Sequence, residues 1–116
     1  MDPRHLRRIK IIQELYRITF LNEKKSKILT VNKILLNINE IDNYIKSFAI
    51  KLSFEKISKI DLAILRLAIY ELIIEKKQPV KVIINEAVEL AKEFGGENSY
   101  KFINGLLGRV YQSTKT

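Results

Sequence analysis

The segment DLAILRLAIYEL, at positions 61–72, decides the fold class. Read with a helical period, it is apolar on nearly every side, which is typical of the central helix of a domain. Ser58, followed three residues later by Asp61, resembles a capping box at the start of this helix. We therefore predict a central helix that begins near Ile60 and stops at Gln78, the residue before a proline.

Two more helices are predicted after the central one. Helical periodicity covers residues 80–94, and Gly95 and Gly96 close this helix, one of them in the left-handed conformation. Asn98 or Ser99 then caps a last helix. The apolar positions of this last helix are Phe102, Ile103, Leu106, Leu107 and Val110.

The N-terminal half also reads as helices. Asp2 and Pro3 open a first helix that ends near Leu21. Its expected buried stripe comprises Leu6, Ile9, Ile12, Leu15 and Ile18. A loop at 22–26, a weaker helix from residue 28 with a break at Asn37–Asn39, and a helix at 41–52 follow. Since no long stretch alternates with period two, the fold class is all-α, a compact single-domain helical bundle.

Composition excludes several kinds of protein. The chain has 116 residues, no apolar run of the ~20 residues that span a bilayer, and no secretory signal. Cysteine is absent, and His5 is the single histidine, here expected to contact backbone or phosphate. The glutamates at 86, 89 and 93 share a helix face that we interpret as solvated. We predict a cytoplasmic protein that is not an enzyme and has no catalytic residue, metal site or cofactor.

The positive charge is concentrated at the two ends of the chain. The net charge is +8, and residues 1–60 hold thirteen Lys or Arg against six acids. Four of the six arginines lie among the first seventeen residues: Arg4, Arg7, Arg8 and Arg17. The planar guanidinium suits phosphate, so the cluster predicts a nucleic-acid surface, with a solvated basic helix as the alternative. We expect Arg4, Arg7 and Arg8 to be exposed, so that alanine there would weaken nucleic-acid binding without unfolding the protein.

Three segments in order resemble the NusB family of transcription antitermination factors. They are residues 61–72, then PVKVIINEAVELAKEFG at 79–95, then SYKFINGLL at 99–107. The arginines of the first helix, with QELY at 13–16, are similar to the family's arginine-rich first helix. The resemblance implies two small helical bundles packed across each other, with the region after the first helix shortened here. It also implies binding of boxA RNA together with NusE, a small-subunit ribosomal protein, which tethers the transcript to RNA polymerase.

The resemblance also assigns roles to residues. The implied RNA-binding residues are Arg4, Arg7, Arg8, Lys101 and Phe102. Tyr16 and Asp61 would face the protein partner. The alternative for Phe102 and for Tyr16 is packing in the core, while Asn85 and Glu86 are expected to make polar contacts between helices or at a helix start.

Other functions remain open from the sequence. NusB-like domains also occur at the N-terminus of some ribosomal RNA cytosine methyltransferases, of which this chain would be a fragment. A helical protein-interaction module without an RNA role is a second alternative, although it gives no reason for the arginine cluster. Homodimer formation through the surface that otherwise binds RNA is a third.

Overall fold

The computed structural model describes residues 2–115 and contains six α-helices and no strand within that range. The helices are α1 (Pro3–Leu21), α2 (Leu29–Leu36), α3 (Ile38–Phe48), α4 (Lys59–Ile69), α5 (Val80–Phe94) and α6 (Ser99–Thr114). A 3-10 turn (Phe54–Lys56) precedes α4, and a π-helical segment (Tyr70–Glu75) continues it. The all-α prediction is confirmed.

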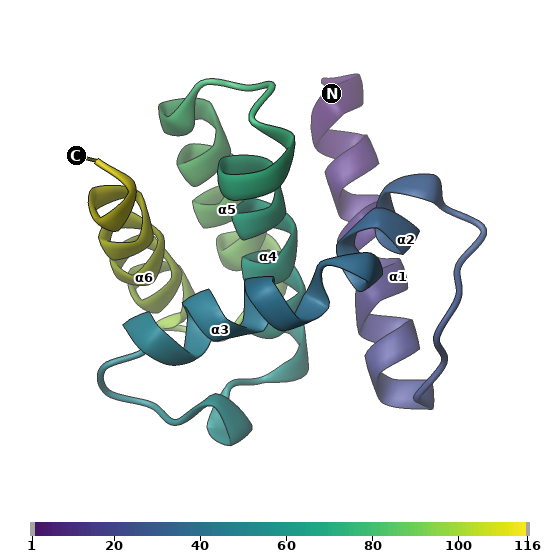
Figure 1. Cartoon of the computed structure of the whole chain (residues 1–116), viewed down its shortest axis with the longest axis horizontal. Helices are drawn as coiled ribbons and strands as arrows, with labels where there is room; N and C mark the ends of the chain where they lie inside the picture. The colour runs from purple at the N-terminus through teal and green to yellow at the C-terminus, as the bar shows by residue number, and fades with distance from the viewer. Residues whose placement is uncertain (1, 116) are drawn as a thin grey trace.

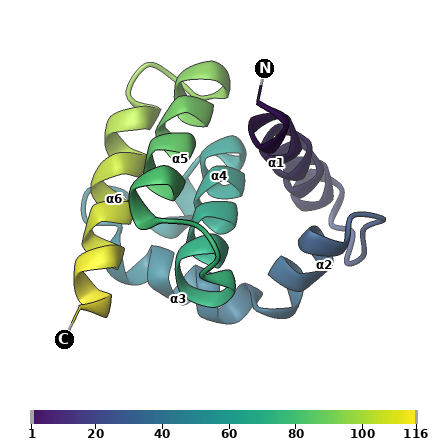
Figure 2. The same ribbon diagram turned by 90° about the horizontal axis from the view of Figure 1, so that it is seen from above.

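Four helices run up and down, and α3 crosses their lower end (Figure 1). Seen from above, α4 lies between α1 and α5, with α6 on the far side of α5 (Figure 2). α4 contacts α1, α3, α5 and α6, so it is the central helix that the sequence predicts. None of the helices within residues 2–115 has the length and apolar character to cross a membrane.

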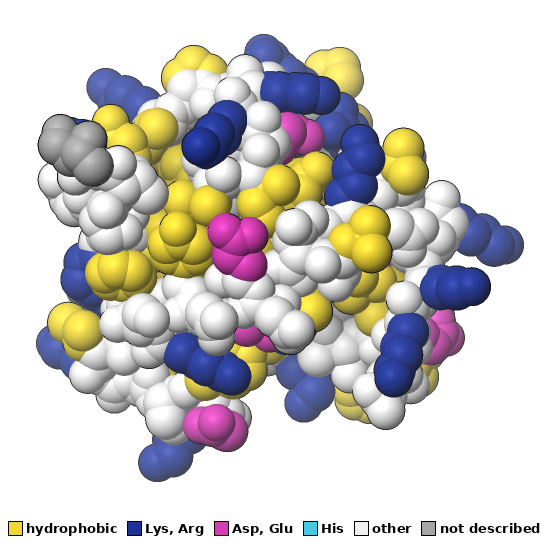
Figure 3. All heavy atoms as spheres, in the orientation of Figure 1, with side chains coloured by type: hydrophobic (Ala, Val, Ile, Leu, Met, Phe, Trp, Pro, Cys, Tyr) yellow, Lys and Arg dark blue, Asp and Glu magenta, His cyan; other side chains and the backbone are white. Residues whose placement is uncertain are grey.

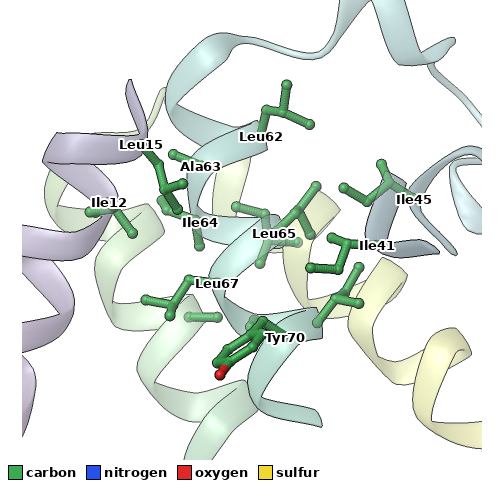
Figure 4. Close-up of a cluster of buried hydrophobic side chains, with 14 of the residues drawn as sticks. Ile12, Leu15, Ile41, Ile45, Leu62, Ala63, Ile64, Leu65, Leu67 and Tyr70 are labelled. Carbon is green, nitrogen blue, oxygen red and sulfur yellow. The ribbon is translucent and has the colours of Figure 1, made fainter. Parts of the chain in front are cut away.

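The core forms around α4 because that helix is buried on several sides. Ile12 and Leu15 of α1 pack on one side of it, and Ile41 and Ile45 of α3 pack on another (Figure 4). Leu65, in the middle of α4, is completely buried between them. Burying aliphatic side chains of this size contributes roughly 1.5–3 kcal/mol each, which makes α4 the main source of packing energy.

The predicted end of the central helix is wrong by three residues. The backbone widens into the π-helical segment, where the Lys76 N–H donates to the Glu71 carbonyl over 2.9 Å. Lys76 itself has left-handed backbone angles (φ 56°) and ends the helix before Gln78. A π turn is not distinguished by the spacing of apolar residues, because it occurs as a short segment within an otherwise α-helical pattern.

The buried stripe of α1 is as predicted at Ile12, Leu15 and Ile18, but it differs in the first turns. Leu6 is exposed, and Arg8 takes the inward position instead, one turn before Ile11 and Ile12. The first turns of α1 face carboxylates of the π segment and of α5 rather than apolar side chains, so polar residues point inward there. The start itself is as expected, because the Asp2 carboxylate accepts the Arg4 N–H at 2.8 Å.

Two arginines fix α3 against the other helices. The predicted break falls at Asn37, but α3 ends at Phe48 rather than near Leu52. Arg109 of α6 donates two hydrogen bonds, of 2.8 and 3.1 Å, to the Phe48 carbonyl. Arg66 of α4 holds the Asp42 carboxylate of α3 with two bonds of 2.9 Å. The end of α3 is therefore set by a tertiary contact.

The turn between α5 and α6 contains no left-handed glycine. Gly95 is extended (φ −89°, ψ −176°), and every glycine within residues 2–115 has negative φ, so the predicted left-handed cap is wrong. Glycine is needed at position 95 for space, because a Cβ there would lie 2.6 Å from the Ser99 Cβ. The Ser99 Oγ also accepts the Gly96 N–H at 2.9 Å, which ties the turn to the start of α6.

Candidate nucleic-acid and protein interfaces

The predicted site residues fall into two groups at opposite ends of the helices. Arg4, Arg7 and Arg8 lie on the first turns of α1, at the upper end in Figure 1. Asp61, at the start of α4, lies with Lys101 and Phe102 of α6 at the lower end, where the three line one groove of about 760 Å³. No residue of this groove also lines the cleft beside the arginines.

Arg4 and Arg7 are exposed on α1, as predicted. The Arg4 guanidinium lies 3.5 Å from the Asp2 carboxylate, and both side chains are largely in solvent. The cleft beside these arginines is also lined by Thr30, Glu75 and Gln78. Exposed guanidinium groups keep their donors free for phosphate oxygens, so these two residues can bind an anionic ligand.

Arg8 differs from its neighbours, because it is only 8% exposed. Its guanidinium donates two hydrogen bonds to the Glu71 carboxylate, of 3.0 and 2.8 Å, and a third of 3.2 Å to Glu86. The hydrogen bonds to Glu71 raise the pKa of Arg8, with burial opposing them. The expectation that Arg8 is exposed is wrong, and its donors already serve the fold, joining α1 to the π segment and α5.

His5 contacts carboxylates rather than backbone or phosphate. Its Nδ1 lies 3.1 Å from a Glu86 oxygen and its Nε2 lies 2.6 Å from a Glu93 oxygen. The Glu86 hydrogen bond, followed by that of Glu93, raises the pKa of His5 against the effect of burial. Two of the three glutamates on this face of α5 therefore hold α1, which corrects the prediction of a merely solvated face and confirms the polar interhelical contact expected of Glu86.

Asp61 lies at the inner wall of the lower groove. It is 7% exposed, its Oδ2 accepts the Ser99 hydroxyl at 3.0 Å, and its Oδ1 has no hydrogen-bond partner in the described structure. Burial raises the pKa of this carboxyl above its ordinary value. The Ser58 hydroxyl accepts the Asp61 N–H at 3.2 Å, so the serine caps α4 as predicted. The aspartate side chain bonds Ser99 of α6 instead of completing a capping box.

Phe102 and Lys101 stand on the rim of the same groove. Lys101 is exposed, and Phe102 is half-buried, with part of its ring against the core. The groove also contains Ile50, Lys51 and Leu52 after α3 and Arg109 of α6, four residues that no sequence pattern singled out. No local signal connects the residues at 50–52 with those of α6, because only the folded chain brings them together.

Tyr16 belongs to an exposed aromatic surface on α1. Its side chain is 41% exposed, which excludes the core-packing alternative, and its ring stacks on that of Phe20 at 6.4 Å between centroids. Gln13, Ile60 and Phe94 line a shallow groove with it. Because Ile60 directly precedes Asp61, this aromatic surface and the Asp61 groove meet at the start of α4. The structure thus places both predicted partner residues at one end of the molecule.

The described residues contain no cluster of three or more His, Cys, Asp or Glu side chains that could hold a metal ion. The chemistry of both ends is that of binding surfaces: guanidinium and ammonium groups, aromatic rings and the buried carboxyl groups of Asp61 and Glu71.

Comparison with known proteins places this arrangement in a family. The model described as the NusB family matches residues 7–112. The chain belongs to the NusB family. The solved structure of T. maritima NusB superposes with a TM-score of 0.83 at 32% identity, covering 96% of this chain and 92% of that one.

Curated relatives carry the name transcription antitermination protein NusB. The protein of Acetivibrio thermocellus is 48% identical over 89 residues, 77% of this chain and 61% of the relative. That of Thermotoga maritima is 47% identical over 74 residues, which are 64% of this chain and 52% of the relative. The matching part of the chain thus spans between about half and three-fifths of the length of these relatives.

Proposed function

We propose that this NusB-family protein is a transcription antitermination factor. It binds boxA-type single-stranded RNA of nascent ribosomal RNA transcripts together with NusE, and it connects that RNA to the elongating RNA polymerase. The observation that carries the proposal is the family match over residues 7–112, joined to exposed arginines at the start of α1. Residues 1–116 would act as one RNA-binding domain, in the cytoplasm, where transcripts are made.

The proposed RNA surface uses both ends of the helices. Arg4 and Arg7 would bind backbone phosphates, as would Lys101 at the other end. The exposed part of the Phe102 ring would stack on a base, because single-stranded RNA presents unstacked bases to aromatic side chains. Arg8 acts indirectly in this proposal: its bonds to Glu71 and Glu86 hold α1 so that Arg4 and Arg7 face outward.

The proposed NusE surface lies where the aromatic surface of α1 meets the Asp61 groove. The Tyr16 and Phe20 rings supply exposed apolar area, which is typical of protein interfaces. The unpaired Oδ1 of Asp61 would accept a hydrogen bond from a donor of the partner that enters the groove. A protein bound here would lie beside Lys101 and Phe102 and could extend the RNA surface.

Titration of a boxA-containing RNA and of a scrambled RNA of equal length tests the proposal, each with and without NusE. We expect the boxA RNA to bind more tightly than the scrambled one, and NusE to increase that difference. Equal affinity for the two RNAs in the presence of NusE would reject the proposal in favour of a protein-interaction module. An unchanged affinity on addition of NusE would reject the partner assignment alone.

A further inference from the structure

Helix α2 exposes leucines on the side that faces away from the core. Val31 and Ile34 are buried, whereas Leu29 and Leu36 are 67% and 85% exposed. The two leucines are seven residues apart, two helical turns, and so lie on one face. A large aliphatic side chain that is this exposed gains nothing in the isolated protein, and a pair on one face is typical of an interaction surface.

Lysines surround these leucines. Lys33 lies between them on the same helix, and Lys24 and Lys25 line a groove of about 390 Å³ that also contains Leu36. In Figure 3, dark-blue side chains surround yellow ones over α2 and the preceding loop, in the right-hand part of the view. We call Leu29, Lys33 and Leu36, with Lys24 and Lys25, the α2 face.

Two acids beside the loop are already engaged by other groups. Glu23 lies 3.1 Å from the Arg17 guanidinium, and Glu14 binds both Arg17 and the Ser26 hydroxyl. The loop is also fixed on the helix, because Asn32 accepts the Ser26 N–H at 2.9 Å and donates to the Ser26 carbonyl at 2.8 Å. The groove is therefore preformed, and the lysines that line it give it a positive electrostatic potential.

We propose that the α2 face binds an acidic amphipathic helix of a partner protein. Leucines spaced two turns apart fit the apolar stripe of such a helix, and the lysines fit carboxylates flanking that stripe. RNA is the poorer fit, because the α2 face has neither an arginine nor an aromatic ring on which a base could stack. A second copy is also a poorer fit, since each copy carries +8 and two of the α5 glutamates are engaged by His5.

This surface is separate from the RNA and NusE surfaces proposed above and does not depend on them. The test uses a labelled amphipathic helical peptide of about five turns, with leucines along one side and glutamates elsewhere. A second peptide replaces each glutamate by glutamine. We expect fluorescence anisotropy to show about tenfold tighter binding of the glutamate peptide at low salt, because several carboxylates meet several lysines.

Variants locate the binding on the protein. The double change Leu29→Ser and Leu36→Ser should weaken binding of the glutamate peptide by about tenfold. Val82→Ser is the matched control, since Val82 is 39% exposed on α5 and lies outside the α2 face and outside the proposed RNA and NusE surfaces. Thermal melting should be the same for all variants, because the altered side chains lie in solvent.

Several results would overturn the proposal. One is equal affinity for the two peptides, and another is a double variant that binds as tightly as Val82→Ser. Loss of affinity for a uridine-rich RNA in Lys33→Glu, with peptide binding unchanged, would identify an RNA surface instead. A dimer in sedimentation that the double leucine variant abolishes would identify a second copy as the occupant.

Discussion

Arg8 joins two helices through charges that are almost completely removed from water. Its guanidinium and the Glu71 carboxylate are each about one-tenth exposed, and two hydrogen bonds connect them. A buried pair of this kind adds little net stability, but removing one partner leaves an uncompensated buried charge. The residue therefore matters for the position of α1 even though it does not face solvent.

Arg8→Ala should lower the free energy of unfolding by about 3–5 kcal/mol, because Glu71 would lose its partner. Chemical denaturation measures the change. Arg7→Ala is the matched control, since Arg7 is exposed one position earlier on the same helix, and its unfolding curve should be nearly that of the parent protein. Equal stability of the two variants would show that the buried pair does not hold α1.

Asp61, a proposed partner residue, carries a charge that acts against the stability of the fold. Burial raises the pKa of its carboxyl above the ordinary 3.8, so the ionised form is less stable in the folded protein than in the unfolded chain. The contribution of the Asp61 carboxyl to the free energy of unfolding is most favourable at a pH below 3.8. This contribution is lost as the pH rises through the raised pKa of the folded protein. The ionised carboxylate therefore lowers the stability of the folded protein, which is expected where a charge serves a partner.

Asp61→Asn should therefore be at least as stable as the parent protein at pH 7 while binding NusE more weakly. Asparagine can still accept the Ser99 hydroxyl, but it removes the buried charge. Denaturation at pH 4 and pH 7, with NusE titrations at pH 7, measures both effects. A variant that loses stability but binds NusE normally would show that Asp61 serves only the fold.

At the scale of elements, the contact between α1 and α5 depends on protonation. His5 of α1 lies between Glu86 and Glu93 of α5, and Arg8 adds a second cation to the same group of carboxylates. The neutral imidazole has one N–H and can donate to only one of the two glutamates, whereas the protonated ring donates to both. The docking of α1 is thus strongest when His5 is charged.

The free energy of unfolding should fall as the pH rises from about 6.5 through the raised pKa of His5. The contribution is complete below the ordinary pKa, because both states are then protonated at this group. His5 is the single histidine, so His5→Gln is a direct control, and its stability should be nearly independent of pH over the same interval. A parent protein with a flat profile there would rule out this contact.

The turn between α5 and α6 depends on the absence of one side chain. At Gly95 a Cβ would lie 2.6 Å from the Ser99 Cβ and 2.7 Å from the Ala91 carbonyl oxygen, whereas at Gly96 the nearest atom is 3.7 Å away. Neither glycine has a positive φ, so neither position requires the backbone freedom of glycine. Alanine substitutions at the two positions therefore differ mainly in the steric crowding that the new Cβ meets.

Gly95→Ala should lower the free energy of unfolding by about 1–3 kcal/mol, the range for overpacking. Gly96→Ala should change it much less. Thermal or urea denaturation of both variants measures the difference. Similar losses of unfolding free energy in the two variants would mean that a small shift of α6 relieves the crowding at position 95.

At the scale of the whole molecule, the proposed RNA surface reaches from one end of the helices to the other. Arg4 and Arg7 supply charge at the upper end, while Phe102 supplies an aromatic ring at the lower end (Figure 1). The two ends share no lining residues, so their contributions to RNA affinity should be nearly additive.

Changing both arginines to alanine should weaken boxA RNA binding and reduce the slope of log affinity against log salt by about 1.4, because each lost phosphate contact on single-stranded RNA removes about 0.7. Phe102→Ala should cost about 1–3 kcal/mol of RNA affinity with the salt slope unchanged. RNA titrations over a series of salt concentrations measure both. An unchanged slope in the arginine variant would remove the start of α1 from the RNA surface.

Local sequence determined the elements of this protein, and tertiary contacts determined which residues reach the surface. The apolar character of residues 61–72, the Ser58 cap and the break at Asn37 depend on neighbours within a few positions, so the helices and the family resemblance could be predicted from them.

Arg8 could not be separated from Arg7 in this way, because its partner Glu71 lies 63 positions along the chain in a π turn. The groove around Asp61 was hidden for the same reason, since it combines residues from the end of α3, the start of α4 and α6. A helical pattern shows which positions can be buried, but a buried charge is placed by a partner from elsewhere in the chain.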